Sequence, residues 1–373
     1  TKSVLRCAVE VCACPSPRAD LMRTALVTGH AGFIGFHLSR RLLNDGWRVI
    51  GVDDLNDYYA VSLKQQRLSL LAENTALTSV IAPIQQEQQL HQLFEEHRPE
   101  IVFHLAAQAG VRHSITNPRS YFQSNLQGTF ELLEAARAFP PQHLLMASSS
   151  SVYGSSDRFP YGETQRSDAP LSFYAATKKS SELMAHSYAH LYGTPITMMR
   201  FFTVYGPWGR PDMAYMKFIK AALAGDGIDV YNNGQMKRDF TFIDDVVEAM
   251  IRLAAVAPGA PAEPALASPP TTAASSIDSL SPIAPHRVVN IGNSRPVELM
   301  DFIASIETAI GRPIRRNFQP MAQGDVQMTW ADTALLQHLT GFRPQVSVQD
   351  GVAALVAWYL QDFSEHEVLS RTG

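Results

Sequence analysis

Short apolar runs alternate with longer segments of mixed apolar and polar residues through the first half of the chain. The runs predict β-strands, and the segments between them have the spacing of helices that bury one face. The predicted strands cover residues 24–28, 48–53, 101–105, 143–148 and 196–202, and two of the predicted helices cover residues 33–44 and 183–191. This alternation is typical of a parallel sheet covered on both faces, so we predict an α/β fold.

The alternation becomes less regular after Tyr205, where glycines and prolines crowd residues 206–211. The change predicts a core over residues 24–205, followed by a smaller C-terminal lobe. We expect that lobe to comprise residues 206–256 and 287–373, with some of its elements returning to the core.

Two segments fit neither unit. Alanine, proline, serine and threonine dominate residues 257–286, a composition that buries little apolar surface and predicts a flexible insertion. Residues 1–23 are predicted to form a disordered, dispensable extension, and they contain all three cysteines, Cys7, Cys12 and Cys14. Because a zinc site would need a fourth ligand and better spacing, we expect no metal, and the rest of the chain has no thiol chemistry.

Charge and hydropathy exclude two classes of partner. The formal net charge of −4 and the pI near 6.3 predict binding neither to nucleic acid nor to an anionic membrane surface. No apolar segment is long enough to span a bilayer, and the first residues lack the zones of a signal peptide. We therefore expect a cytoplasmic protein that does not bind membranes.

A glycine-rich turn, TGHAGFIG at residues 28–35, follows the first predicted strand and opens the first predicted helix. Gly29 permits a tight turn, Gly32 lets the backbone approach a diphosphate, and Gly35 allows close packing of the helix on the strand. Asp53 ends the second predicted strand, where its carboxylate can accept both ribose hydroxyls and would repel a 2′-phosphate. We therefore predict a Rossmann-type doubly wound sheet that binds NAD in preference to NADP.

Tyr174 and Lys178 are four residues apart, which places both on one face of a helix. A free tyrosine has a pKa near ~10, so we expect the lysine charge and the oxidised cofactor to favour the phenolate. Tyr174 would then take a proton from a hydroxyl as hydride leaves the carbon. The four serines at residues 148–151 end a predicted strand at the carboxyl edge of the sheet, where we expect their hydroxyls to point at a substrate.

Further segments complete an ordered set of motifs. The set comprises TGHAGFIGFHL, VDDLNDYY, HLAAQAGVRHSI, SSSSVYG, YAATKKSSELMAH, RFFTVYGPWGRPDMA, RDFTFIDD and VVNIGNS. In these motifs the chain resembles the nucleotide-sugar epimerases and dehydratases of the extended short-chain dehydrogenase/reductase family. Within that family it is most similar to the enzymes that epimerise UDP-glucuronate at C4. The resemblance runs from Thr24 to about Tyr359, apart from the insertion.

The resemblance implies NAD as cofactor, a UDP-sugar as substrate, and a homodimer formed through helices near residues 127–137 and 180–192. It makes Ser149 the catalytic hydroxyl beside Tyr174 and Lys178. Arg238 would face the nucleotide diphosphate, which suits the fork of an arginine. The implied substrate-binding residues are Ser149, Ser150, Ser151, Thr203, Arg210 and Arg238. The predicted cofactor-binding residues are Gly29, Gly32, Phe33, Ile34, Gly35, Asp53, Ala106, Ala107, Gln108, Tyr174 and Lys178.

The chain departs from the family pattern at two places. Residues 81–85 read IAPIQ and lack the acid with which many members contact the adenine amino group. Residues 322–326 read AQGDV where the family usually has Gln-Pro-Gly-Asp-Val, which affects one nucleotide contact.

Three alternatives remain beside C4 epimerisation of UDP-glucuronate. One is decarboxylation of the same substrate, and another is epimerisation of a different nucleotide sugar, because fold does not fix the reaction. Ser150 and Ser151 stand where dehydratases of this class have acidic residues, which argues against dehydration. A non-catalytic NAD-binding regulator is the third alternative, and the intact set of Ser149, Tyr174 and Lys178 argues against it.

Overall fold

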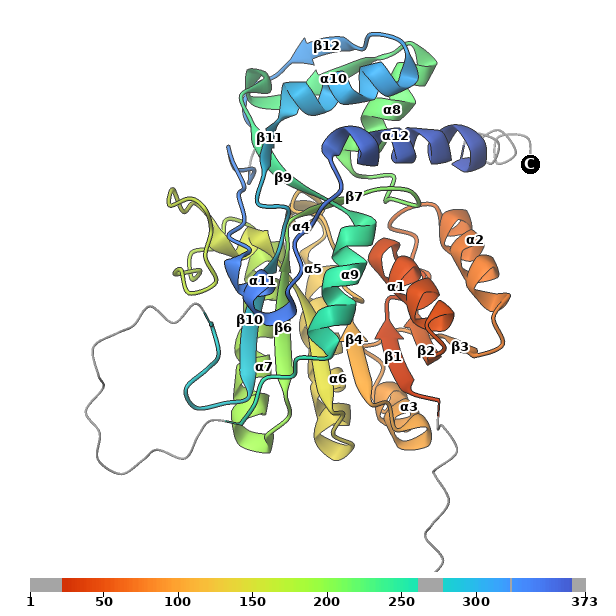
Figure 1. Ribbon diagram of the computed structural model, residues 1–373, viewed down its shortest axis with the longest axis vertical. Helices are drawn as coiled ribbons and strands as arrows, with labels where there is room; N and C mark the ends of the chain where they lie inside the picture. Colours follow the sequence, from red (N-terminus) through yellow and green to blue (C-terminus); the bar gives the residue numbers. More distant parts are fainter. Residues whose placement is uncertain (1–21, 261–277, 323, 364–373) are drawn as a thin grey trace, which may run out of the picture.

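The computed structural model describes residues 22–260, 278–322 and 324–363. Its centre is a parallel sheet with strand order β10-β6-β5-β4-β1-β2-β3 (Figure 1). These strands are β1 (Thr24–Thr28), β2 (Arg48–Asp53), β3 (Leu77–Ile81), β4 (Ile101–His104), β5 (His143–Ser149), β6 (Ile196–Phe201) and β10 (His286–Ile291). The chain builds outward from β1 in one direction and then from β4 in the other, which opens a crevice at the carboxyl ends of these two strands.

Helices cover both faces of the sheet, and each layer closes its own hydrophobic core. Phe36, Val246 and Leu336 belong to the core of one face, whereas Phe94, Leu132 and Ala185 belong to the core of the other. The first layer contains α1 (Phe33–Asn44), α2 (Val61–Ala72), α9 (Ile243–Ala254) and α11 (Ala334–Thr340). The second layer contains α3 (Gln89–His97), α6 (Gly128–Ala138) and α7 (Phe173–Tyr192). Burial on both sides is evident in β6, which is buried at every position although it contains Thr197 and Arg200.

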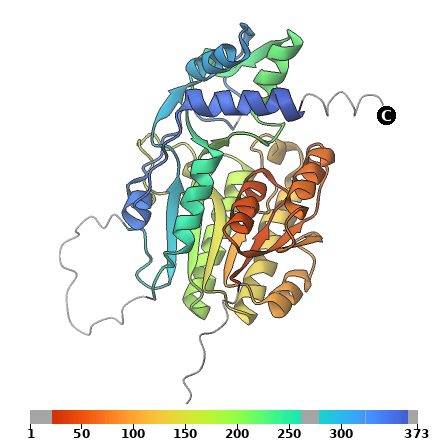
Figure 2. The same cartoon turned by 45° about the vertical axis from the view of Figure 1, so that its right-hand side comes forward.

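A smaller lobe lies beyond the carboxyl ends of the central strands (Figures 1 and 2). It has a three-stranded sheet, β11 (Pro296–Glu298), β9 (Lys237–Phe242) and β7 (Thr203–Tyr205), and a pair formed by β12 (Arg315–Phe318) and β8 (Gly227–Val230). Its helices are α8 (Ala214–Ala224), α10 (Leu299–Ile310) and α12 (Val348–Trp358). Shorter elements are α4 (His113–Thr116), α5 (Pro118–Tyr121), η1 (Phe122–Gln127), η2 (Ser150–Tyr153), η3 (Tyr231–Gly234) and η4 (Tyr359–Phe363).

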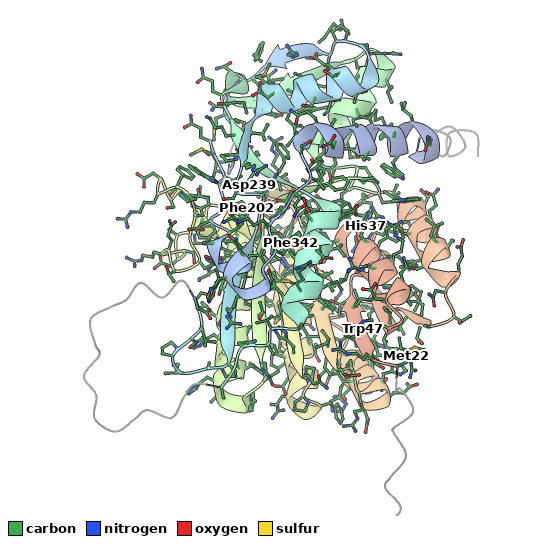
Figure 3. The ribbon with its side chains drawn as sticks, in the orientation of Figure 1. Met22, His37, Trp47, Phe202, Asp239 and Phe342 are labelled. Carbon is green, nitrogen blue, oxygen red and sulfur yellow. The ribbon has the colours of Figure 1, made fainter. Side chains whose placement is uncertain are left out.

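A buried carboxylate holds the lobe to the core. Asp239 on β9 is fully buried, and its two oxygens accept hydrogen bonds from the backbone nitrogens of Asn293 at 2.7 Å, Ser294 at 3.0 Å and Ala331 at 3.0 Å. Burial raises the pKa of Asp239 to about 6, although these donors lower it in part. Figure 3 shows Asp239 and Phe202 close together where lobe and core meet.

The architecture confirms the predicted α/β fold with a doubly wound sheet. The predicted elements 24–28, 33–44 and 48–53 match β1, α1 and β2 at both ends. The other three predicted strands each differ from β4, β5 and β6 by one residue at the C-terminal end. Beyond residue 205, α9 and β10 are elements that return to the core.

Part of the predicted insertion is folded. Ser281 donates its backbone N–H to His286 at 2.9 Å, Arg287 pairs with Asp278 at 2.8 Å, and Ala284 is fully buried. Residues 278–286 therefore pack along the start of β10, because one small apolar side chain and several polar groups find partners there. The extension with its cysteines lies outside the described residues, apart from residues 22 and 23. Within the described ranges, no helix combines the length and the hydropathy needed to cross a membrane.

Candidate active site

The glycine-rich turn between β1 and α1 requires glycine at two positions. Gly29 has a φ of +77°, and a Cβ atom there would lie 2.8 Å from the backbone nitrogen of Ala106. A Cβ atom at Gly35 would lie 2.0 Å from the carbonyl oxygen of Gly29. A side chain at either position would push α1 away from β1 or displace the loop that follows β4.

The first turn of α1 presents unpaired backbone donors to the crevice. The helix begins at Phe33, so the N–H groups of Phe33, Ile34 and Gly35 have no carbonyl partner within it, and no side chain caps this end. All three residues line the pocket. A helix start of this kind binds a diphosphate through its N–H groups and its dipole, so the turn fits the diphosphate of NAD.

Asp53 ends β2 on the wall of the same crevice and is almost fully buried. One carboxylate oxygen accepts a hydrogen bond from Ala31 N at 3.2 Å, and the other accepts one from Leu55 N at 2.9 Å. These bonds fix the carboxylate and leave each oxygen a further lone pair. The geometry is therefore compatible with the predicted contact to the ribose hydroxyls.

The loop after β4 forms the opposite wall. Ala106 donates its backbone N–H to Thr28 Oγ1 at 3.2 Å, and Gln108 donates its own to Asn125 Oδ1 at 2.8 Å. Asn125 also donates to Thr177 Oγ1 on α7 at 3.0 Å. One buried amide thus connects the cofactor side of the pocket to the helix that carries the predicted catalytic pair.

Tyr174 and Lys178 lie on the face of α7 that meets the pocket. Lys178 Nζ donates to the carbonyl oxygen of Ala147 at 3.0 Å, and burial lowers the pKa of Lys178 to about 8. Burial also raises the pKa of Tyr174, although a hydrogen bond with Ser149 and the charge of Arg210 lower it in part. The expected lowering of the Tyr174 pKa is therefore not produced by the protein alone, because burial has the larger effect.

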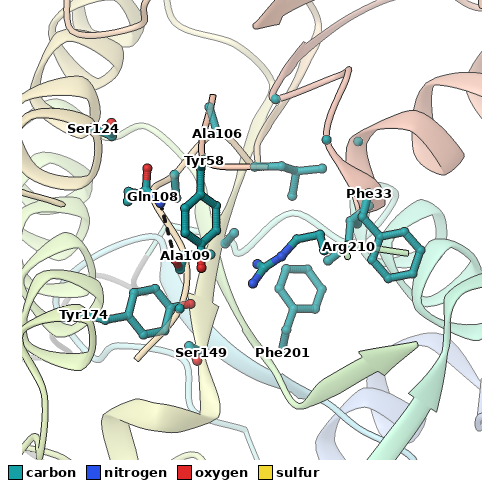
Figure 4. Close-up of a pocket in the computed structure, with 18 of the residues that line it drawn as sticks. Phe33, Tyr58, Ala106, Gln108, Ala109, Ser124, Ser149, Tyr174, Phe201 and Arg210 are labelled. Atoms are coloured by element: carbon teal, nitrogen blue, oxygen red, sulfur yellow. Dashed lines mark hydrogen bonds between the residues drawn. The ribbon is translucent and has the colours of Figure 1, made fainter. Parts of the chain in front are cut away.

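The serines at the end of β5 reach the pocket from the adjacent strand. Ser149 Oγ accepts a hydrogen bond from Ser151 N at 3.2 Å and donates to Ser151 Oγ at 3.2 Å. Ser150 also lines the pocket. Figure 4 shows the hydroxyls of Tyr174 and Ser149 facing the same space, an arrangement in which a proton can pass between them and a bound substrate.

Ser148 differs from the three serines that follow it. Its hydroxyl donates to Glu182 on α7 at 2.6 Å, because successive side chains of a strand point to opposite faces. Glu182 also accepts two hydrogen bonds from Arg200 at 2.8 Å and one from Lys179 at 3.0 Å. Ser148 also lines the pocket, but Glu182 accepts the hydrogen bond of its hydroxyl, so we no longer expect this hydroxyl to donate to a substrate.

Arg210 and Thr203 enter from the lobe side of the pocket. Arg210 donates from Nε and Nη2 to the two carboxylate oxygens of Asp212, at 3.0 and 2.7 Å. Burial disfavours the charge on Arg210, but Asp212 outweighs this effect and raises the pKa of Arg210 above its ordinary value. The pocket therefore contains a permanent cation held by a carboxylate.

Arg238 does not line the pocket. Its Nη2 donates to Asp325 at 2.7 Å and to the carbonyl oxygen of Val326 at 2.6 Å, and its Nη1 donates to the carbonyl oxygens of Lys237 and Gln327. Asp325 does line the pocket and belongs to the turn in which the sequence departs from the family. The predicted contact of Arg238 with a diphosphate stays a prediction.

One pocket collects the other predicted residues. They are Gly29, Gly32, Phe33, Ile34, Gly35, Asp53, Ala106, Ala107, Gln108, Ser149, Ser150, Ser151, Tyr174, Lys178, Thr203 and Arg210. The wall also contains Tyr58, Lys64, Ile84 and Gln85. Tyr58 belongs to the motif VDDLNDYY, in which the sequence pattern singles out only Asp53, the aspartate that ends the strand. In the parts of the chain that the structure describes, no three His, Cys, Asp or Glu side chains gather as a metal site.

Comparison with known proteins agrees with this geometry. Residues 25–262 match the model of the NAD dependent epimerase/dehydratase family. A probable UDP-glucuronate 4-epimerase of Rhizobium meliloti (strain 1021) is 50% identical over 338 residues, which cover 91% of this chain and 97% of that protein. UDP-glucuronate 4-epimerase 4 of Arabidopsis thaliana is 42% identical over 346 residues, which cover 91% of this chain and 76% of that protein.

Solved structures show the same likeness. The UDP-glucuronic acid 4-epimerase of Bacillus cereus in complex with UDP-glucuronic acid and NAD superposes with a TM-score of 0.79 at 31% identity, over 91% of this chain and 99% of that one. The UDP-glucose 4-epimerase of Thermotoga maritima with UDP-glucose superposes with a TM-score of 0.77 at 27% identity, over 91% of this chain and 100% of that one.

Proposed function

The chain belongs to the NAD-dependent epimerase/dehydratase family, and we propose that it interconverts UDP-glucuronate and UDP-galacturonate. The observation that carries this proposal is the position of Ser149 and Tyr174 in one pocket with the glycine-rich turn. The enzyme is an isomerase that uses NAD, and the sequence similarity to named UDP-glucuronate 4-epimerases supports this substrate over other nucleotide sugars.

The residues of the pocket divide the proton chemistry between them. NAD, when bound, accepts a hydride from C4 of the sugar and returns it later. Tyr174 takes the proton of the C4 hydroxyl, and Ser149 relays it because the two hydroxyls face the same space. Lys178 contributes positive charge on the cofactor side and favours the tyrosinate during that transfer. The 4-keto sugar then rotates, and reduction of its opposite face inverts C4.

The same pocket has to protect the substrate carboxylate. Oxidation at C4 gives a β-keto acid, which loses carbon dioxide when the carboxylate bond aligns with the carbonyl π system. We assign Ser149, Ser150, Ser151 and Thr203 to hold the carboxylate away from that alignment. Each neutral hydrogen bond contributes only about 1 kcal/mol net, so several must act together. Decarboxylation to a UDP-pentose is the alternative that failure of this restraint would produce.

The two units have separate tasks in this proposal. The core around the seven-stranded sheet binds NAD, and the lobe that contains β7, β9 and β11 binds the nucleotide end of the substrate. Arg210 contacts the substrate inside the pocket, whereas Arg238 faces the diphosphate from behind Asp325. A nucleotide-sugar substrate and the absence of cysteine after Cys14 favour a cytoplasmic enzyme.

We also assign a homodimer to the face formed by η1, α6 and α7. Large apolar side chains are exposed there, including Phe122 at 55%, Phe130 at 45%, Leu183 at 62% and Leu191 at 64%. Helices α6 and α7 lie against each other and η1 contacts both, so these exposed side chains belong to neighbouring elements. A second copy of the same chain would cover them, as expected for a two-fold interface made from one helix pair per subunit.

Product analysis tests the reaction. Purified protein is incubated with UDP-glucuronate that carries ¹³C in the carboxylate, and the products are followed by NMR and mass spectrometry. We expect UDP-galacturonate as the main product, with the label retained and NAD oxidised at the end. Release of most of the label as carbon dioxide would show a decarboxylase, and absence of any product from uronates would exclude the substrate.

Tyr174→Phe tests the assignment of the base. Because the phenol acts when the proton moves, kcat should fall by about 10²–10⁴-fold while the Kd for UDP-glucuronate stays nearly unchanged. The control is Tyr188→Phe on the same helix, which likewise removes one phenol hydroxyl, here one that donates to Glu134 at 2.6 Å, but lies outside the pocket. Retention of more than a few per cent of the wild-type kcat would remove Tyr174 from the mechanism.

A further inference from the structure

Asp212 binds the guanidinium of Arg210 along one edge, the edge formed by Nε and Nη2. Nε and Nη2 donate to Asp212, and Nη2 also contacts Met213 Sδ at 3.7 Å. Within the described ranges, Nη1 has no hydrogen-bond partner from the protein. Figure 4 shows this guanidinium extending into the pocket near Tyr58 and Phe201. A fork held in this way has a free edge for a substrate anion.

Tyr58 fixes the carboxylate that holds this fork. Its hydroxyl donates to Asp212 Oδ2 at 3.0 Å, across 154 positions of sequence. The tyrosine ring packs against His113 with centroids 4.7 Å apart, and a Cβ atom at Gly110 would lie 2.5 Å from the Tyr58 hydroxyl. Burial and the charge of Asp212 raise the pKa of Tyr58 to about 12, so the hydroxyl remains a donor at neutral pH.

Arg67 on α2 fixes the loop that precedes Arg210. It is fully buried, and its guanidinium donates to the carbonyl oxygens of Ala31 at 2.8 Å and Trp208 at 2.6 Å. Ala31 lies in the glycine-rich turn, and Trp208 lies two residues before Arg210. One buried cation therefore joins the backbone of the cofactor turn to the backbone of the substrate loop.

Trp208 shows why that loop needs support. Its φ is +59°, a left-handed conformation that is unfavourable for a bulky residue. The indole packs against Phe36 on α1, with centroids 5.5 Å apart, and against Trp358 on α12, with centroids 5.3 Å apart. Packing and the Arg67 hydrogen bond together maintain a conformation that the tryptophan would not adopt alone.

We propose that the segment 58–67 positions Arg210 for the substrate, Tyr58 by way of Asp212 and Arg67 by way of the loop backbone. The proposal rests on the proposed function, since it requires Arg210 to contact the nucleotide sugar. The segment follows the strand that ends in Asp53, and Arg67 also contacts the cofactor turn. The segment therefore sets the position of Arg210 relative to the cofactor turn. Tyr58 and Arg67 are positioning residues, because they act through Arg210 and take no part in the proton transfer.

Tyr58→Phe is the first test, because it keeps the ring and removes the hydrogen bond to Asp212. The KM for UDP-glucuronate should rise about tenfold, and kcat should stay within about twofold, since a binding contact is weakened equally in ground and transition states. The content of NAD in the purified protein should not change. Tyr188→Phe, the matched tyrosine–carboxylate control, should leave KM, kcat and NAD content at wild-type values.

A double-mutant cycle separates positioning from direct contact, because Tyr58 itself lines the pocket. In an Arg210→Gln background, Tyr58→Phe should change the KM by less than about twofold. An equal rise of KM in both backgrounds would show that Tyr58 acts on the substrate directly, and this result would overturn the proposal while leaving the proposed function intact. If the wild type neither converts nor binds any UDP-sugar, the proposed function fails first.

Arg67→Lys gives an independent test of the second link. The lysine keeps the charge but cannot reach both Ala31 and the Trp208 carbonyl with a planar fork. We expect a higher KM for UDP-glucuronate together with a lower NAD content, and a melting curve at several protein concentrations shows whether the fold is kept. A folded variant with wild-type KM would overturn the role of Arg67.

Discussion

Two arginine–carboxylate pairs lie near the pocket and share one geometry but have different surroundings. Arg200 and Glu182 are joined by two hydrogen bonds of 2.8 Å, and their side chains are only 2% and 3% exposed. Arg210 and Asp212 are joined by two hydrogen bonds of 3.0 and 2.7 Å, but their side chains are 21% and 24% exposed. The first pair lies near the C-terminal end of β5, where Glu182 accepts a hydrogen bond from Ser148, whereas Arg210 of the second pair lines the pocket.

The remaining donors of each arginine distinguish the two pairs. Arg200 uses all three of its nitrogens inside the protein, because Nη1 donates to the carbonyl oxygen of Glu163 and Nη2 also reaches Ser167, both at 3.2 Å. Arg210 leaves Nη1 without a protein partner in the described part of the chain. A pair whose donors are all satisfied maintains structure, whereas a pair with one open edge can bind a ligand.

Glu182→Ala should have the largest effect on stability. Removal of one partner of a buried pair leaves an uncompensated charge, so the apparent free energy of unfolding should fall by about 3–5 kcal/mol in urea at a fixed protein concentration. The double variant Glu182→Leu/Arg200→Met should recover most of that loss, because it removes both charges. A cost below about 1 kcal/mol for Glu182→Ala would mean that the two pairs do not differ as described.

The pKa of Glu163 shows whether Glu182 compensates the positive charge of Arg200, because an uncompensated charge would lower that pKa. Burial raises the pKa of Glu163 to about 7, and Arg200 lowers it only in small part. A free glutamate titrates near ~4.3, so the stability that protonated Glu163 contributes is present below that pH and is lost as pH rises towards 7. Glu182 has a pKa of about 2, so its contribution is lost only in more acidic solution.

The pH dependence of unfolding tests this assignment. Between about pH 5 and 7, the free energy of unfolding of the wild type should fall relative to that of Glu163→Gln by on the order of 2 kcal/mol. Asp239, with a pKa raised to about 6, titrates in both proteins and cancels from the difference. Parallel stability curves for the two proteins would show that Glu163 is already ionised through its proximity to Arg200.

Asp212→Asn should have the smallest effect on stability. The pair at the pocket wall reaches solvent, so the free energy of unfolding should change by less than about 1 kcal/mol. The KM for UDP-glucuronate should nevertheless rise about tenfold, because Arg210 loses the charged partner that orients it. Denaturation and steady-state kinetics on the same preparation give both numbers, and a large loss of stability with unchanged KM would reverse the assignment of the two pairs.

The order of elements and the cofactor turn were determined by the sequence itself. Strand and helix periodicities are local properties, so β1, α1 and β2 could be predicted to the residue. Gly29 and Gly35 are required by backbone contacts within one strand–turn–helix unit, and a single short motif therefore encodes them. Tyr174 and Lys178 share a helix face for the same local reason.

Some tertiary features left a signal in the sequence that could have been used. Glu182 follows Lys178 by four residues and Tyr174 by eight, so the helical period alone places it on the same face of α7. The strand period likewise separates Ser148 from Ser149. Neither the helix period nor the strand period predicts the partner of Glu182. That partner, Arg200, lies on β6 and meets α7 only when the sheet and the helix pack.

The partners of the polar side chains in the pocket were decided by the tertiary structure alone. Tyr58 and Asp212 are 154 positions apart and meet because the loop after β2 and the loop after β7 converge over the same crevice. Arg238 pairs with Asp325 across 87 positions, a partner that lies outside its own motif RDFTFIDD. Local periodicity determines which face of its helix or strand a side chain occupies. Its hydrogen-bond partner depends on how distant segments pack, and the local sequence pattern does not predict that packing.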